Sequence, residues 1–257
     1  MDIPDKLNWQ TAFNASFNRN KIVKLYGDMV DVFDANGNKT GVKEGDDYTN
    51  KWFIGHSIES IWDYKPNGVW QVEDETLANS YGGFLPGEYR MMDVNNDGLY
   101  TELEDKQFLG YSKPQFRWNM MNDFTLFNNI SVSFSLYGQH GWKENYAEKF
   151  GNERESDYVI KYWTPENRSN KWARMSNRDG DPKPQSNYIN MGFVRLSDIS
   201  IGYIFPKHIT NLLHLQHLKV YGSVQNVAVW SRWTGWDPEN IGGPVPRYFN
   251  LGINIKL

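Results

Sequence analysis

The sequence predicts an all-β fold, in which about seven strands form part of a large antiparallel transmembrane β-barrel with long extracellular loops. Three observations support this prediction. Apolar residues recur at every second position through most of the chain, which is the period of a strand with two different faces. Short and long connections roughly alternate between these segments, as in outer-membrane barrels. Aromatic residues make up 16% of the chain, a high share that requires a structural use.

The expected strands begin near the N-terminus. Residues 7–20 alternate, and one face carries Leu7, Trp9, Thr11, Phe13, Ala15 and Phe17. Residues 58–64 show the weakest alternation of the set. Residues 115–127 alternate again, with one face formed by Phe116, Trp118, Met120, Phe124 and Leu126. Each segment therefore has the pattern of a strand with one apolar and one polar face.

The second half of the chain is more regular. Residues 129–139 place apolar side chains opposite a row of serines, and residues 195–205 and 218–230 follow the same pattern more loosely. Residues 247–257 alternate to the last position, with one face formed by Phe249, Leu251, Ile253, Ile255 and Leu257. No long helix is expected anywhere in the chain.

Connection lengths favour a barrel. The turn at residues 127–129 is very short, whereas the connection at residues 141–190 is very long. The next is moderate, and residues 232–246 form a longer one. In a barrel, this alternation places the short turns in the periplasm and the long loops outside. A soluble β-sandwich also alternates, so a stand-alone carbohydrate-binding module remains the alternative.

Composition excludes several classes of protein. The net charge of −4, with both signs mixed along the chain, provides no basic surface for nucleic acid. No apolar run approaches the roughly 20 residues of a membrane-spanning helix. Cysteine is absent, which excludes disulfides and thiolate metal sites. The first ten residues lack the pattern of a signal peptide, so we expect either an intracellular protein or part of a longer one.

The stretch DVNNDGLYTELED, residues 93–105, matches the spacing of an EF-hand calcium loop. The expected calcium ligands are the side chains of Asp93, Asn95, Asp97 and Glu104 and the backbone carbonyl of Leu99, with Gly98 at the sharp turn. Because no helices are expected on either side, the ion would stiffen an extracellular loop rather than drive a sensor-type opening. The alternative is an acidic turn without an ion, since Asn-Asp-Gly is a common turn sequence.

Tryptophans raise a second question, namely whether they stack on sugars or serve the structure. The tryptophans concerned are Trp52, Trp62, Trp70, Trp230, Trp233 and Trp236. For the last three, an interfacial aromatic girdle or loop packing is the favoured interpretation, and for the first three a structural role. His214 and His217 lack an evident third ligand, so we expect a solvated turn there. No catalytic motif is present, and we expect no enzyme activity.

Seven segments, in order, resemble one family. They are NKIVKLYG, KWFIGHSIESIWDYKPNGVWQ, PGEYRMMDVNNDG, YWTPENRSN, FVRLSDISIGYIFP, LKVYGSVQNVAVWSRWTGWDPE and RYFNLGINIKL. Together they resemble the C-terminal portion of SusC/RagA-like TonB-dependent outer-membrane transporters of Gram-negative bacteria. The resemblance implies a share of a barrel of roughly 22 strands, closed by a plug. It also implies a SusD-like surface lipoprotein as partner, energy supplied by TonB, and import of oligosaccharides or peptides.

The chain departs from that family in having no plug domain, TonB box or signal peptide. We therefore expect residues 1–257 to be the C-terminal part of the barrel, with the remaining strands and the plug supplied from elsewhere. About seven strands cannot close a plugged barrel, and an unpaired edge in lipid is costly. The chain ends in Leu257 where such barrels more often end in an aromatic residue, yet the last strand is still expected to serve as the assembly signal.

Overall fold

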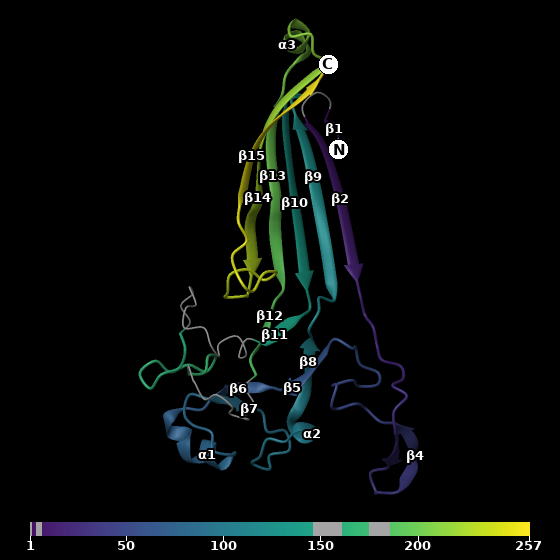
Figure 1. Cartoon of the computed structure of the whole chain (residues 1–257), viewed down its shortest axis with the longest axis vertical. Coiled ribbons are helices and arrows are strands. Elements are labelled where there is room, and N and C mark those ends of the chain that lie inside the picture. Colours follow the sequence, from purple (N-terminus) through teal and green to yellow (C-terminus); the bar gives the residue numbers. More distant parts are fainter. Residues whose placement is uncertain (1, 4–6, 146–160, 175–185) are drawn as a thin grey trace. The chain divides into compact units, whose positions relative to one another are not determined.

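The computed structural model describes residues 2–3, 7–145, 161–174 and 186–257 (Figure 1). The chain divides into two units. The first, called here the sheet unit, comprises residues 1–18, 114–141 and 191–257. The second, called the loop unit, comprises residues 19–113 and 142–190. The loop unit is therefore formed by two long insertions between strands of the sheet unit.

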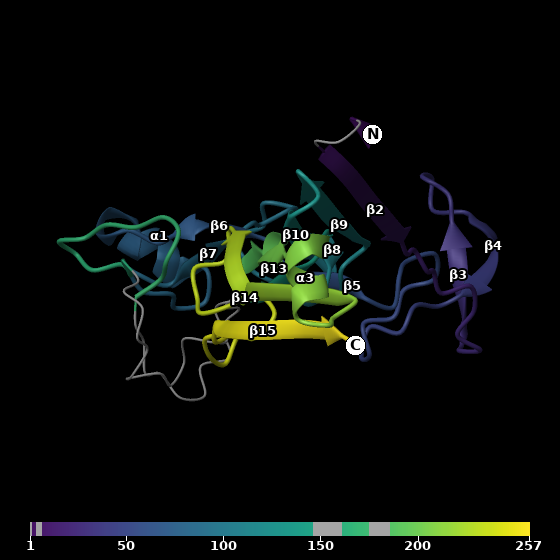
Figure 2. The ribbon, with the colours of Figure 1, turned by 90° about the horizontal axis from the view of Figure 1, so that it is seen from above.

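The sheet unit is a seven-stranded antiparallel sheet in the order β1-β2-β9-β10-β13-β14-β15. The strands are β1 (Asp2–Ile3), β2 (Leu7–Phe17), β9 (Phe116–Leu126), β10 (Ile130–His140), β13 (Phe193–Ile204), β14 (His217–Ser231) and β15 (Tyr248–Lys256). Six of them correspond to the expected strands, which confirms the all-β fold class. Viewed end-on, the strands follow one another along a curve from β2 to β15 (Figure 2).

The strand register gives the sheet two different faces. Trp9 lies opposite Phe124, which lies opposite Val132 on the next strand, and Val132 lies opposite Ile201. Such rows collect the apolar side chains on one face, called here the apolar face. On β15, at one end of the sheet, Leu251 is 92% exposed and belongs to this face. The other face, called the polar face, collects most of the serines, asparagines and glutamines; Asn122 is an exception on the apolar face, where it accepts a hydrogen bond from Nε1 of Trp9 at 3.2 Å.

Short connections on one side of the sheet follow simple turn chemistry. The β9–β10 turn places both Phe127 (φ 51°) and Asn128 (φ 60°) in the left-handed region, and the amide of Asn129 donates to the carbonyl of Leu126 at 3.1 Å. Two left-handed central residues match the twist of antiparallel strands. The β13–β14 connection contains the short helix α3 (Lys207–Leu212).

One expected strand was placed in the wrong sheet. Residues 58–64 do contain a strand, β5 (Ser60–Tyr64), but it pairs with β8 (Lys106–Tyr111) in the loop unit. The seventh strand of the main sheet is instead the two-residue β1. The reason is packing: Trp62 of β5 is buried against Phe53, with ring centroids 5.0 Å apart, and Phe53 also contacts Phe108 of β8.

The loop unit consists of short elements. Its further strands are β3 (Met29–Phe33), β4 (Lys39–Glu44), β6 (Pro66–Val69), β7 (Tyr89–Met91), β11 (Lys143–Asn145) and β12 (Tyr188–Asn190). Its helices are η1 (Val72–Asp74), α1 (Glu75–Ser80) and α2 (Glu102–Asp105). They pair as β3–β4, β6–β7 and β11–β12, in addition to β5–β8. Among the described residues, no helix has both the length and the apolar character needed to cross a membrane.

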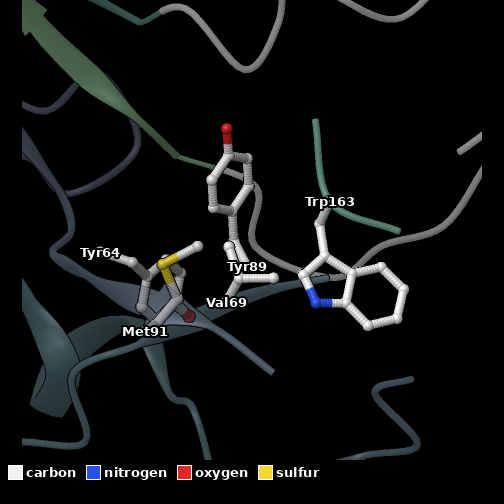
Figure 3. Packing of buried hydrophobic residues seen from close by; sticks show 5 residues of the cluster. All are labelled: Tyr64, Val69, Tyr89, Met91 and Trp163. Carbon is white, nitrogen blue, oxygen red and sulfur yellow. The ribbon is translucent and has the colours of Figure 1, made fainter. Parts of the chain in front are cut away.

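Aromatic side chains form the core of the loop unit. One cluster contains Tyr64, Val69, Tyr89, Met91 and Trp163 (Figure 3). A second consists of Trp70, Ala78 and Phe84. Gly87 lies where its positive φ of 90° and the neighbouring Trp163 ring leave no room for a side chain. A Cβ at this position would clash with that ring, so only glycine fits.

Candidate functional site

A groove lies on the polar face of the sheet unit. It has a volume of about 430 Å³ and is formed by β2, β9, β10 and β13. Its polar lining residues are Asn14, Ser16, Arg117, Asn119, Ser135, Tyr137, Gln139, Ser197 and Asp198, and its larger apolar ones are Trp118, Met121 and Leu136. Its lining is therefore rich in amide and hydroxyl groups, which can both donate and accept hydrogen bonds.

Strand register brings the groove residues together. Asn14, Asn119 and Tyr137 lie opposite one another on three adjacent strands, and the amide nitrogen of Asn14 donates to the side-chain oxygen of Asn119 at 3.1 Å. On β13 the register shifts between Leu196 and Asp198. Ser197 is the extra residue of this bulge, and both Ser197 and Asp198 line the groove.

The β14–β15 loop, residues 232–247, is held on the polar face by an ion-pair network. Arg195 of β13 donates through Nη2 to both carboxylate oxygens of Asp237, at 2.7 and 2.8 Å. Its Nε donates to Oε2 of Glu239 at 3.0 Å. The side chains of Arg195 and Asp237 are only 5% and 3% exposed, whereas that of Glu239 is 31% exposed. The Arg195–Asp237 pair is therefore buried, and Glu239 lies at its rim.

Two groove residues take part in the same network. The hydroxyl of Tyr137 donates to Oε2 of Glu239, and Nε2 of Gln139 donates to Oε1 at 3.2 Å. The ring of Tyr137 also packs edge-on against buried Phe193, with centroids 5.7 Å apart. The groove and the loop therefore share side chains.

The tryptophans fall into two groups. Trp62, Trp70 and Trp233 are buried, as expected for a role in packing. The others keep part of their surface open, with Trp52 39%, Trp236 42% and Trp230 57% exposed. Trp230 lies opposite Val194 near the end of β14 and thus belongs to the apolar face.

The predicted calcium loop is wrapped by its own side chains. Asp93 accepts hydrogen bonds from the amides of Asn96 (2.6 Å) and Gly98 (2.9 Å). Asn95 accepts one from the amide of Asp97 (3.2 Å), and Asp97 accepts one from the amide of Leu99 (2.8 Å). The side-chain Nδ2 of Asn95 also donates to Oδ2 of Asp97 at 3.1 Å. The structure thus gathers the first three predicted side-chain ligands around one turn.

Glu104 does not join them. Its Oε2 accepts a hydrogen bond from the hydroxyl of Thr101 at 2.8 Å. The neighbouring Asp105 is fully buried and accepts from the amides of Val94 and Thr101, both at 2.8 Å, which closes the loop. Within the described part of the chain, no three acidic or histidine side chains form a group that could hold a metal ion. Calcium binding stays a prediction, and it requires Glu104 to leave Thr101.

Hydrogen bonds also set the charge of this loop. Burial acts to raise the pKa of Asp93, but hydrogen bonds from Gly98, from the Tyr81 hydroxyl and from Asn96 outweigh it and hold the pKa below its usual value. The bond to Asp93 in turn raises the pKa of Tyr81. Asp93 is therefore ionised at neutral pH, as a calcium ligand must be.

Sequence reasoning missed the ion-pair network. In the segment containing Asp237 and Glu239 the sequence draws attention to the tryptophans, and Arg195 is only the first residue of the strand expected at residues 195–205. Arg195 and Asp237 are 42 positions apart, so no local pattern connects them. The sequence did offer one signal, an arginine at the start of a predicted strand. If such an arginine is buried, it requires a carboxylate partner.

Comparisons with known proteins identify relatives of the chain. No protein-family model matches it. It is 28% identical over 275 residues to TonB-dependent receptor P3 of Formosa agariphila, covering 97% of the chain and 27% of that receptor. It is 27% identical over 270 residues to TonB-dependent receptor SusC of Bacteroides thetaiotaomicron, covering 97% of the chain and 24% of SusC. The chain thus spans about a quarter of the length of the curated relatives it matches.

Solved structures of the RagAB peptide importer share the fold. The open-open state matches with a TM-score of 0.63 at 17% identity, over 100% of this chain and 27% of that one. The closed-closed state matches with a TM-score of 0.65 at 16% identity, over 99% of this chain and 28% of that one. The chain is therefore a homologue of TonB-dependent receptors, SusC among them, over nearly its whole length, and its fold is that of the C-terminal part of such a receptor's barrel.

Proposed function

We propose that this chain forms part of the wall and outer loops of a TonB-dependent importer of oligosaccharides or peptides in the outer membrane of a Gram-negative bacterium. The observation that carries the proposal is the single-layer sheet with an apolar face that no other described part of the sheet unit covers. Leu251, Phe249 and Ile253 on that face are 92%, 77% and 64% exposed. Rows of exposed apolar side chains are unfavourable in water and favourable against lipid.

The edges of the sheet support the same proposal. Strands β2 and β15 lie at or next to its two ends, and among the described residues only the two of β1 pair with β2 on its outer side. Backbone groups in a bilayer require partners, so further strands of the same barrel would pair with these edges. The remaining partners would be the plug in the lumen, TonB on the periplasmic side and a SusD-like lipoprotein outside. This assignment agrees with the family of the relatives.

Aromatic side chains near the strand ends fit a membrane. Trp9 and Phe124 stack with centroids 5.6 Å apart near one end of the apolar face, and Trp230 lies near the other end. Amphipathic rings at both ends of transmembrane strands form the girdles of outer-membrane barrels. A stand-alone soluble module would instead bury this face under a second sheet.

The groove supplies the substrate chemistry. Its amide and hydroxyl side chains suit a neutral polar ligand, such as the hydroxyl groups of an oligosaccharide or the backbone of a peptide. Import, rather than catalysis, is what the homologues' names indicate. No enzymatic role is proposed for the groove.

Calcium would act on the outer loops. We infer that Asp93, Asn95, Asp97, the carbonyl of Leu99 and Glu104 would bind it, with Glu104 turning from Thr101 toward the ion. Three of these side chains are already gathered at the turn. The ion would neutralise the acidic loop and stiffen it, for which weak extracellular-type affinity suffices.

The test of the proposed function is uptake by cells in which the gene is deleted and then restored. Fluorescent oligosaccharides and peptides of defined length serve as substrates, and outer-membrane fractions are blotted for the C-terminal epitope. Ser135→Phe fills the groove and should reduce uptake, while Ser133→Phe, on the same face of β10 but outside the groove, should not. Finding the epitope only in the soluble fraction would refute the proposal.

A further inference from the structure

The contacts of Glu239 connect the groove to the β14–β15 loop. Its Oε2 accepts hydrogen bonds from Arg195 and Tyr137, and its Oε1 accepts one from Gln139. Tyr137 and Gln139 also line the groove. Two donors that a ligand in the groove would meet are therefore the donors that hold Glu239.

The attachment of the loop has two parts of different character. The Arg195–Asp237 pair is buried and doubly hydrogen-bonded, and Asp237 also accepts from the amide of Glu239 at 2.9 Å. Glu239 is 31% exposed, and two of its three side-chain partners belong to the groove. The Arg195–Asp237 ion pair is called here the pin. The contacts of the Glu239 side chain with Arg195, Tyr137 and Gln139 are called the clasp.

Release of the clasp leaves no buried charge without a partner. Arg195 keeps both carboxylate oxygens of Asp237 when Glu239 moves away. Glu239 itself is exposed enough to be solvated by water. Release of the pin, in contrast, would leave a guanidinium that is 5% exposed without its main counter-charge, which is strongly unfavourable.

We propose that Glu239 reports occupancy of the groove to the loop. A ligand that presents hydrogen-bond acceptors to Tyr137 and Gln139 displaces the side chain of Glu239 and frees residues 240–245 of the loop. The pin keeps residues 232–239 on the polar face, and the side-chain amide of Asn226 holds the carbonyl of Pro246 at 2.8 Å. The acceptors are the hydroxyl oxygens of a sugar or the carbonyl oxygens of a peptide. This inference rests on the proposed function in one respect, that the groove is the ligand site.

The coupling itself can be tested without a ligand. The 257 residues contain no cysteine, so Gly242→Cys introduces one thiol into the chain, at a position where a Cβ meets no atom within 4 Å. A nitroxide at this position, in protein purified in detergent from the host outer membrane, reports the mobility of the loop by electron paramagnetic resonance. Glu239→Gln should raise the mobile fraction.

Changes to the groove residues Tyr137 and Gln139 should act on the loop through their hydrogen bonds to Glu239. Tyr137→Phe with Gln139→Ala removes donors in the groove and should raise the mobile fraction as much as Glu239→Gln does, and the two changes together should add nothing further. Asp123→Asn, on the polar face outside the groove, serves as the control and should leave the signal unchanged. Additive effects, or an unchanged signal in the groove variant, would overturn the inference.

Two probes then separate the source of the acceptors. Maltoheptaose and an uncharged heptapeptide are titrated against the labelled protein. A rise in mobility with one probe, absent in the Glu239→Gln protein, assigns the acceptors to that class and supports the coupling. If the variants behave as expected and neither probe changes the signal, the coupling stands and the groove's role as ligand site is refuted.

Discussion

Substituting Leu251 by arginine separates a membrane-embedded sheet from one in water. Leu251 is the fourth residue of the nine-residue strand β15, belongs to the apolar face and is 92% exposed. In water, replacing so exposed a side chain would change the free energy of unfolding by no more than about 0.5 kcal/mol. In a bilayer, an arginine near the midplane on the lipid side costs about 2–4 kcal/mol.

Asn250→Arg is the matched control, because Asn250 is the preceding residue and belongs to the polar face. The measurement is guanidinium unfolding of the complete protein refolded into phosphatidylcholine vesicles, with the slope checked for a constant value among the variants. We expect Leu251→Arg to lose about 2–4 kcal/mol and Asn250→Arg to lose little. Equal losses in the two variants, or a loss below about 0.5 kcal/mol for Leu251→Arg, would show that the apolar face does not meet lipid.

Three further predictions concern the loops. Asp237→Asn should destabilise the docked β14–β15 loop by up to about 3–5 kcal/mol, because it leaves buried Arg195 under-compensated; protease cleavage of that loop measures this, and equal resistance of the variant would contradict the role of the pin. Calcium should slow proteolysis of residues 93–105, and Asp97→Ala should abolish the effect; protection that persists in the variant would argue against the predicted site. Burial raises the pKa of Tyr100 to about 12, so the stability of the loop unit that depends on the neutral phenol is complete below the ordinary tyrosine pKa of about 10 and declines as the pH rises toward 12. Tyr100→Phe should flatten that decline in near-ultraviolet circular dichroism, and an unchanged decline would assign it to other groups.

Local patterns predicted the strands but not all of their partners. The alternation in β10 or β15 arises because the two faces of the strand meet different environments, and about ten residues suffice to recognise it. The partner of β5 depends on aromatic contacts with Phe53 and Phe108, which lie 9 and 46 positions from Trp62 in sequence, and alternation carries no information about them. The strand was therefore predicted and its sheet was wrong.

The candidate sites show the same division. The first half of the calcium motif is local, and each of its turns is closed by a side chain bonded to an amide a few residues on. The position of Glu104 depends on Thr101 and on Asp105, whose buried carboxylate was not part of the motif. Spacing alone could not indicate that Asp105 would take the inward position.

The two units depend on their surroundings in different ways. Of the buried apolar side chains described, all except Met191, Phe193 and Trp233 belong to the loop unit. The loop unit thus has its own cores around Trp70 and Tyr89, which bury apolar surface within the protein. The sheet unit buries few apolar side chains of its own. Two of the three described, Phe193 and Trp233, belong to β13 and the β14–β15 loop.

Because the sheet unit buries so few apolar side chains, the pin contributes to its structure. A single-layer sheet gains little from burial within itself, so lipid on one face and neighbouring strands at its edges must supply most of its stability. The β14–β15 loop provides the remaining internal contribution on the polar face, where Arg195 and Asp237 hold it beside Phe193. A buried ion pair gives little net stabilisation compared with apolar packing, but it fixes one geometry, because any other arrangement leaves a charge without a partner. The pin therefore sets where the loop lies on the polar face, and the groove that the loop adjoins keeps a defined shape even though the sheet has no core of its own.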